Sequence, residues 1–251
     1  MDKSTGGHPT IVLVHGAWAD ASSWTGVIQR LQAAGHDVVA LPNTLRGPKA
    51  DAAVIRNYLD TIGGPVVLVA HSYGGFVITN AATGAQNVKA LVYVDAFIPD
   101  EGQPAVALAG QASALVPALT NPTATFRLVP IPGAPPDVVD TYLLPTTVRE
   151  SFAQDVPAED AAVIYATQRP ASFAGLAEPS GPPAWKDIPA WAIIGRQDKI
   201  IDPVSLRAMA EHAGAKITEI DASHVSMVSH PDVVVEVIET ALREVGELQP
   251  A

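Results

Sequence analysis

The chain has 251 residues, of which 48% are hydrophobic and 16% charged, and its formal net charge is −11. This length and composition indicate a folded protein with one large domain or two small ones, and the acidic excess argues against nucleic acid and anionic membrane surfaces as partners. The absence of cysteine excludes disulfides, a thiolate nucleophile and cysteine-based metal sites.

The start of the chain, residues 1–8, contains no apolar segment, and no apolar run elsewhere reaches the roughly 18 residues needed to span a bilayer. We therefore expect neither a signal peptide nor a membrane segment, and a cytoplasmic location.

The first hundred residues alternate short apolar runs with longer helical patterns. Strands are predicted at 10–14, 37–41, 65–70 and 88–94, and helices at 22–34, 49–62 and 72–84. The strands are continuous apolar runs rather than alternating ones, which is typical of strands buried on both faces of a parallel sheet. This order predicts βαβ units and an α/β fold, with a mostly parallel sheet flanked by helices.

The alternation of predicted strands and helices ends after Phe97. Fourteen of the 22 prolines lie between Pro99 and Pro183, which argues against long strands there, and from 103 to 148 the only charged residues are Arg127, Asp137 and Asp140. Such a segment favours a cap (lid) insertion over a site, at 98–187, with a core domain formed by 1–97 and 188–251. The α/β rhythm resumes with strands at 190–194 and 216–220 and helices at 204–213 and 231–245.

A serine follows the third predicted strand, in the segment Ala70-His71-Ser72-Tyr73-Gly74-Gly75. A serine between a buried strand and a helix, with small residues two positions before and after it, matches the nucleophile-elbow pattern Gly-x-Ser-x-Gly, with Ala70 in place of the first glycine. The alternative interpretation is a serine that caps the following helix.

A nucleophilic serine needs a base, and the base needs an acid that fixes its tautomer. Asp198 and His224 each come just after a predicted strand, so they should meet Ser72 at the carboxyl edge of the sheet. The order serine, aspartate, histidine favours a Ser–His–Asp triad. Asp95, which ends the fourth strand, is the alternative acid.

Backbone N–H groups could stabilise the oxyanion that forms when the serine attacks an ester. The candidates are the N–H of Tyr73, directly after the serine, and that of Ala17 or Trp18 in the loop after the first strand. His15, before a glycine in the same loop, is predicted to anchor the loop rather than to act as a base, and His71 to point away from the site. The remaining histidines, His36, His212 and His230, are interpreted as structural or solvated.

Over nearly its whole length the chain resembles the α/β-hydrolase superfamily. The segments His15-Gly16-Ala17-Trp18, Ala70 to Gly75, Val94-Asp95-Ala96-Phe97 and Ser223-His224 are similar to those of the small branch that contains plant methyl-ester esterases, hydroxynitrile lyases and bacterial esterases. The resemblance implies a cap after the fourth strand, a Ser–His–Asp triad and no cofactor. Hydroxynitrile lyases of this branch carry a lysine after the catalytic histidine, where this chain has Val225, which weakens the lyase interpretation.

The leading hypothesis is therefore a serine esterase that cleaves carboxylic esters through an acyl-enzyme, as a monomer or homodimer, with no metal. Perhydrolase, thioesterase or hydroxynitrile-lyase-like activity and a non-catalytic ligand-binding receptor remain alternatives. The nearly uncharged cap predicts a pocket for small-to-medium apolar or aryl esters. Its candidate wall residues are Phe97, Phe126, Leu128, Tyr142, Leu144 and Tyr165, with Leu115, Leu119, Leu143 and Phe152.

Overall fold

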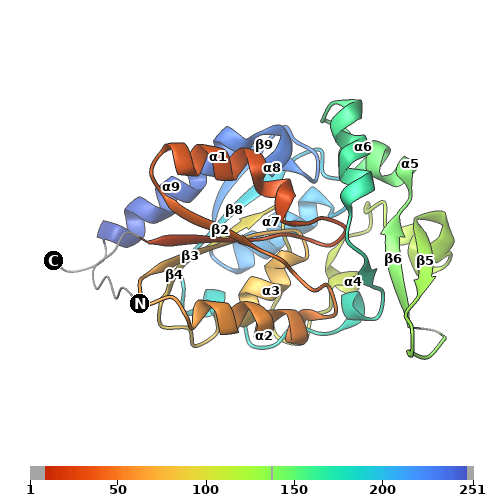
Figure 1. Ribbon diagram of the computed structural model, residues 1–251, viewed down its shortest axis with the longest axis horizontal. Coiled ribbons are helices and arrows are strands. Elements are labelled where there is room, and N and C mark those ends of the chain that lie inside the picture. The colour runs from red at the N-terminus through yellow and green to blue at the C-terminus, as the bar shows by residue number, and fades with distance from the viewer. Residues whose placement is uncertain (1–8, 137, 248–251) are drawn as a thin grey trace.

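The protein is described by a computed structural model that covers residues 9–136 and 138–247. A parallel sheet with helices on both faces forms one end of the molecule, and a smaller, largely separate layer lies at the other (Figure 1). The expectation about residues 1–8 and the charge of Asp137 lie outside the described residues. Across the described part of the chain, no helix is both long and apolar enough to cross a membrane.

Within these residues six parallel strands form the main sheet, in the order β2-β1-β3-β4-β8-β9. They are β1 (Thr10–Val14), β2 (Asp37–Leu41), β3 (Val66–His71), β4 (Val88–Val94), β8 (Ala190–Gly195) and β9 (Lys216–Ile220). Every residue of β3 and β8 is buried, whereas the edge strands β2 and β9 are partly exposed. Helices cover both faces of the central strands, which is why their sequences are continuously apolar. The predicted fold class and strands are confirmed.

The helices of the core pack in two layers. One face of the sheet is covered by α1 (Thr25–Ala33) and α9 (Pro231–Glu247), and the other by α2 (Pro48–Leu59) and α3 (Gly74–Ala81) (Figure 1). Helix α7 (Pro203–His212) packs against β8 and β9, and the short α8 (Ser226–Ser229) precedes α9.

Two predicted helices begin later than expected. The helix predicted from residue 22 begins at Thr25, after a separate 3₁₀ turn at Ala21–Trp24. The side chain of Asp20 accepts the N–H of Ser22 and caps that turn. The helix predicted from Ser72 begins at Gly74, since Ser72 and Tyr73 form the turn that leaves β3.

Residues 98–187, which lie within the segment that connects β4 to β8, form the insertion. Its strands form a three-stranded antiparallel sheet, β5-β6-β7, which the sequence did not predict: β5 (Phe126–Pro130), β6 (Val139–Leu143) and β7 (Ala171–Ser172). The strands are short and a proline ends β5, as expected from the many prolines of this segment. The remaining elements are α4 (Ala105–Leu108), α5 (Pro145–Thr147), α6 (Ala158–Thr167), a π-helical turn at Val148–Phe152, and 3₁₀ turns at Val116–Leu119, Pro122–Ala124, Gly175–Ala177 and Ala184–Lys186.

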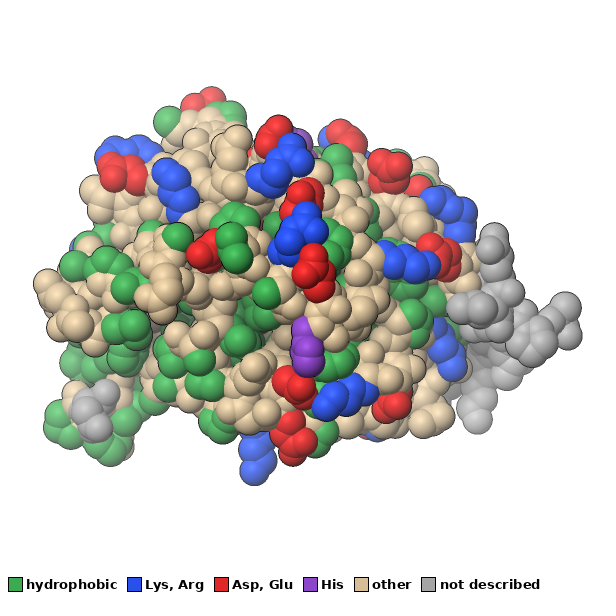
Figure 2. All heavy atoms as spheres, turned by 180° about the vertical axis from the view of Figure 1, so that it is seen from behind, with side chains coloured by type: hydrophobic (Ala, Val, Ile, Leu, Met, Phe, Trp, Pro, Cys, Tyr) green, Lys and Arg blue, Asp and Glu red, His purple; other side chains and the backbone are tan. Residues whose placement is uncertain are grey.

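The surface differs between the two ends of the molecule. In the view from behind, charged side chains of both signs spread over the core, whereas hydrophobic and uncharged side chains predominate at the lower part of the insertion (Figure 2). Val106 and Leu119, both in the insertion, are 44% and 60% exposed. The insertion thus presents apolar surface to solvent as well as to the core.

Candidate active site

Ser72 lies in a strained turn at the carboxyl end of β3. Its φ angle of 52° is in the left-handed region, which a non-glycine residue adopts only where the surrounding structure imposes it. Two neighbouring glycines make the turn possible: a Cβ atom on Gly16 would lie 2.7 Å from the Cβ of Ser72, and one on Gly75 only 2.0 Å from the carbonyl oxygen of Phe97. Ala70 is buried within β3 and fits where the motif usually has glycine. The expected strand–turn–helix around the serine is present.

His224 and Asp198 lie in line with the serine hydroxyl. The Oγ of Ser72 is 2.8 Å from Nε2 of His224, and Nδ1 of His224 is 2.7 Å from Oδ2 of Asp198. The loop after β9 carries His224, and the loop after β8 carries Asp198, as the sequence predicted. The other carboxylate oxygen of Asp198 accepts the N–H groups of Ile200 and Ile201, at 2.7 and 3.0 Å. The carboxylate is thereby held with one oxygen toward the imidazole.

Burial determines the charge of these groups. His224 is completely buried, and this lowers its pKa, so that the imidazole is neutral and able to accept a proton near neutral pH. Burial also raises the pKa of Asp198, and the hydrogen bonds that it accepts from Ile201 and Ile200 oppose that shift.

Asp95, the alternative acid, points elsewhere. Its Oδ1 accepts the N–H of Gly195 at 2.6 Å, and its Oδ2 accepts the hydroxyl and the N–H of Ser226. The side chain is fully buried, and desolvation together with the charge of Asp198 raises its pKa. Asp95 therefore links β8 to α8, and the structure brings Asp198 rather than Asp95 to Nδ1 of His224.

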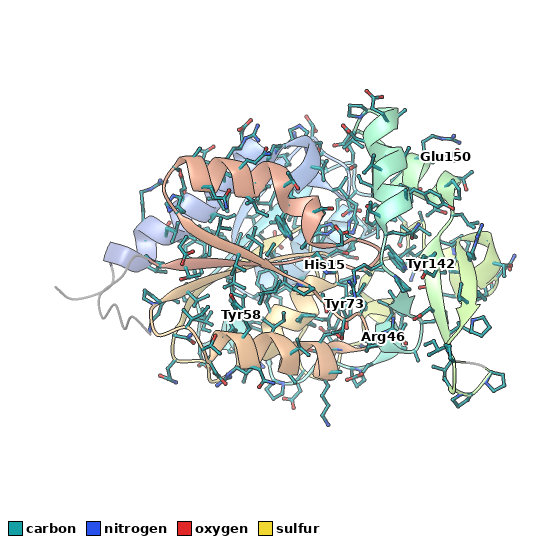
Figure 3. All side chains as sticks on the ribbon, viewed as in Figure 1. His15, Arg46, Tyr58, Tyr73, Tyr142 and Glu150 are labelled. Atoms are coloured by element: carbon teal, nitrogen blue, oxygen red, sulfur yellow. The ribbon has the colours of Figure 1, made fainter. Side chains whose placement is uncertain are left out.

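Three residues that the sequence offers as backbone donors line the cavity beside the serine. Ala17, Trp18 and Tyr73 line it together with Ser72. Among the described residues, the N–H groups of these three donate to no protein atom. The phenol of Tyr73 donates to Asp51 of α2 at 2.7 Å, so its hydroxyl is engaged with the core. Figure 3 shows Tyr73 and His15 at the end of the sheet that faces the insertion.

The other histidines serve the local structure. Nε2 of His15 accepts the N–H of Asn43 at 2.8 Å, and its Nδ1 is 2.9 Å from the carbonyl oxygen of Gly16, which anchors the loop as expected. His71 does not point away from the site as predicted, because its Nε2 lies 2.7 Å from the carbonyl oxygen of His224 and the two ring centroids are 4.8 Å apart. The remaining partners are Glu239 for His36, Asp100 for His212 and Ser229 for His230.

The cavity in front of Ser72 lies between the core and the insertion, and its walls are apolar. Of the predicted wall residues, Phe97, Phe126, Leu115 and Leu119 line it. The other predicted wall residues do not: they are Leu128, Tyr142, Leu143, Leu144, Phe152 and Tyr165. For Tyr142 the phase of β6 gives the reason, because its neighbours Thr141 and Leu143 are buried on the inner face, which turns Tyr142 outward. Tyr142 and Tyr165 line a separate surface depression with Arg127.

Several wall residues were not predicted individually. They are Ala105, Val106, Ala109, Gly110, Ser113, Val116 and Ala118 early in the insertion, Phe173 and Leu176 near its end, and Ile200 in the core. The uncharged run after residue 103 was the sequence signal for the first group. Among the described residues no charged side chain lines the cavity, and the hydroxyl of Ser113 is bonded to the carbonyl oxygen of Ile200 at 2.6 Å. Ser72 is thus the side chain whose polar group is available to react.

The comparisons with known proteins agree with this architecture. The chain is 38% identical over 110 residues to a carbendazim hydrolyzing esterase of Nocardioides, and 34% identical over 119 residues to methylesterase 7 of Arabidopsis thaliana. The alignments cover 39% and 41% of this chain and 46% and 45% of the relatives, so the chain spans about half the length of the curated relatives that it matches. An alpha/beta hydrolase of Aspergillus novofumigatus is 26% identical, over 96% of this chain and 99% of its own length.

Solved structures show the same fold at low sequence identity. Polyneuridine aldehyde esterase superposes with a TM-score of 0.73 at 22% identity, covering 93% of this chain and 99% of that one. A methylesterase from Arabidopsis superposes with a TM-score of 0.75 at 19% identity, covering 94% and 99%. The model of the alpha/beta hydrolase family matches residues 11–237, and the chain therefore belongs to the alpha/beta hydrolase family.

Proposed function

We propose that the protein is a serine hydrolase that cleaves carboxylic esters with small-to-medium, neutral, apolar or aryl groups. The observation that carries this proposal is the buried array of Ser72, His224 and Asp198, with contacts of 2.8 and 2.7 Å, at the base of an uncharged cavity. A hydroxyl is activated by such an array because the neutral imidazole can take its proton while the carboxylate stabilises the imidazolium that results.

The reaction follows from these contacts. The Oγ of Ser72 attacks the ester carbonyl carbon while its proton passes to Nε2 of His224, and Asp198 holds the opposite N–H. The carbonyl oxygen becomes an oxyanion, which the N–H of Tyr73 and that of Ala17 or Trp18 stabilise. His224 then returns the proton to the leaving alkoxide, so that an alcohol departs and an acyl-enzyme remains. Water, deprotonated by His224, attacks the acyl carbon and releases the carboxylic acid and Ser72.

The insertion, residues 98–187, acts in this proposal as a cap over a core formed by 1–97 and 188–251. Support comes from the cavity walls, since Ser72, Tyr73 and Ile200 belong to the core and Leu115 and Phe126 to the insertion. A site between two layers excludes water from the reacting groups, which strengthens their electrostatic interactions.

Relatives whose names include esterase and methylesterase support ester cleavage over the other chemistries of this fold. Perhydrolase and thioesterase activity use the same cycle with peroxide or a thioester and remain as side activities to measure. A hydroxynitrile-lyase-like reaction is disfavoured, because position 225 is a buried valine with no charge to stabilise cyanide.

A turnover assay separates the proposed enzyme from a non-catalytic receptor. Purified protein is incubated with excess 4-nitrophenyl butyrate, with Ser72→Ala as the matched control. We expect steady release of 4-nitrophenol over many equivalents, and a loss of about 10⁴–10⁶ in kcat for Ser72→Ala. Release that stops at one equivalent would support a receptor, and equal turnover by both proteins would refute the role of Ser72.

A further inference from the structure

Trp18, in the loop after β1, has an unusual backbone conformation for a bulky residue. Its φ angle is 55°, in the left-handed region, and its side chain is almost completely buried. Such a conformation costs on the order of 1–3 kcal/mol and persists only where other contacts impose it. The contacts of this side chain therefore determine where the loop places its N–H groups.

These contacts come from the insertion. The indole Nε1 donates to the hydroxyl of Thr141 in β6 at 3.1 Å, and the ring stacks on Phe126 of β5 with centroids 5.1 Å apart. The hydroxyl of Thr141 in turn donates to the carbonyl oxygen of Ala171 in β7, at 2.8 Å. One fully buried hydroxyl thus joins the loop after β1 to two strands of the insertion sheet.

Tyr73 offers a counterpart on the other side of the serine. Its side chain is tied to the core, through its hydrogen bond to Asp51 of α2. The N–H groups on the two sides of Ser72 are therefore held by different layers of the molecule, one by the core and one by the insertion.

We propose that Thr141 is a positioning residue: its hydroxyl holds Trp18, and thereby sets the backbone N–H groups of Ala17 and Trp18 that receive the oxyanion. The proposal rests on the esterase function proposed above. Oxyanion donors act only when they lie about 2.7–3.1 Å from the developing charge, so a small shift of this loop lowers the rate more than it lowers substrate binding. The insertion thus takes part in catalysis by geometry, in addition to forming a wall of the cavity.

The test is Thr141→Val, which keeps the shape of the side chain and removes both hydrogen bonds. Thr141 is absent from the cavity walls, so the substitution leaves the pocket surface unchanged. We expect kcat to fall about 10-fold with KM within about twofold, which is less than the roughly 10²–10³ for removing a donor outright. Thr141→Ser retains the hydroxyl and should restore most of kcat.

Thr79→Val is the matched control. The hydroxyl of Thr79 is also buried and bonds to Tyr93, at 2.8 Å, but it touches neither the cavity nor the triad. If a lost buried hydrogen bond acts only through stability, both Thr79→Val and Thr141→Val will lower the melting temperature, and neither will change kcat. Unchanged kcat in a folded Thr141→Val would overturn the proposal, as would a loss of kcat that Thr141→Ser does not restore.

A double-mutant cycle with Trp18→Phe tests the bond itself, since phenylalanine can still stack on Phe126 but has no N–H to donate. We expect Trp18→Phe to lower kcat for a small acetate ester, and Thr141→Val to add little to that loss. Additive losses would contradict the coupling. Should Thr141→Val fail to fold, unchanged kcat in Trp18→Phe is sufficient to overturn the proposal. Wild-type protein without ester turnover would instead refute the esterase function.

Discussion

Placing a carboxylate on the acyl chain of a good ester substrate is expected to remove most of its turnover, because the described side chains that line the cavity in front of Ser72 carry no positive charge to pair with it. In the part of the chain that the structure describes, no charged side chain lines the cavity, and the hydroxyl of Ser113 is already bonded to a backbone carbonyl. The prediction therefore concerns kcat/KM for a neutral ester against its analogue with a terminal carboxylate.

The magnitude follows from two transfer costs. Each methylene buried against the apolar walls contributes about 0.8 kcal/mol, or roughly fourfold in kcat/KM, until the chain fills the cavity. An unpaired buried charge costs several kcal/mol, and a penalty of about 3 kcal/mol already corresponds to roughly a hundredfold. We expect kcat/KM to rise about 15-fold from acetate to butyrate, and to fall at least about 100-fold when the chain ends in a carboxylate.

The assay uses 4-nitrophenyl esters of matched chain length, corrected for spontaneous hydrolysis. Arg127→Ala is the control, because Arg127 lines the surface depression with Tyr142 and Tyr165 instead of the cavity, and we expect no change in this variant. A carboxylate ester that is cleaved faster than its neutral analogue, with Arg127→Ala removing the advantage, would refute the reasoning.

Three further predictions concern the triad and the turn. Burial lowers the pKa of His224, so the acid limb of kcat/KM should lie below the ordinary imidazole value of 6.5. The contribution of His224 to the free energy of unfolding should be full above pH 6.5 and should decline as the pH falls below it, because only the unfolded chain then binds the proton. A pH titration of kcat/KM with its midpoint at or above 6.5 would contradict this. Asp198→Asn should lower kcat about 10⁴-fold, whereas Asp95→Asn, which does not touch His224, should stay within roughly tenfold, and steady-state kinetics showing the reverse order would assign the acid to Asp95. Gly75→Ala would put a Cβ atom 2.0 Å from a carbonyl oxygen and should lower the melting temperature by about 5–10 °C. Gly63→Ala, whose Cβ atom would meet open space, should leave the melting temperature unchanged. Equal melting temperatures for the two variants would refute the predicted steric clash at Gly75.

The parts of the fold that could be predicted depend on local signals. Continuous apolar runs marked the parallel strands, and Ser72, Asp198 and His224 could be identified because each follows the carboxyl end of such a strand. The cap walls carried a weaker signal. The uncharged composition of the insertion indicated an apolar cavity, but the orientation of Tyr142 depends on how β6 pairs with β5, which the composition does not encode.

Contacts between distant residues were the least predictable. Trp18 and Thr141 are 123 positions apart, and their hydrogen bond exists only because the antiparallel sheet packs on the loop after β1. A threonine in an apolar, proline-rich segment carries no local sign of such a contact. Ile200 likewise reaches the cavity because the loop after β8 turns toward the insertion.

The most direct test of the triad is covalent labelling of the serine. Wild-type protein and Ser72→Ala are treated with a fluorophosphonate, which reacts with an activated serine hydroxyl, and are analysed by intact mass and peptide mapping, with circular dichroism to verify that both are folded. The structure predicts a single adduct on Ser72 in the wild type and none in the variant, because among the described residues only this hydroxyl is bonded to a fully buried, neutral imidazole. A folded wild-type protein that takes no label, or labelling at another residue that persists in Ser72→Ala, would contradict the account.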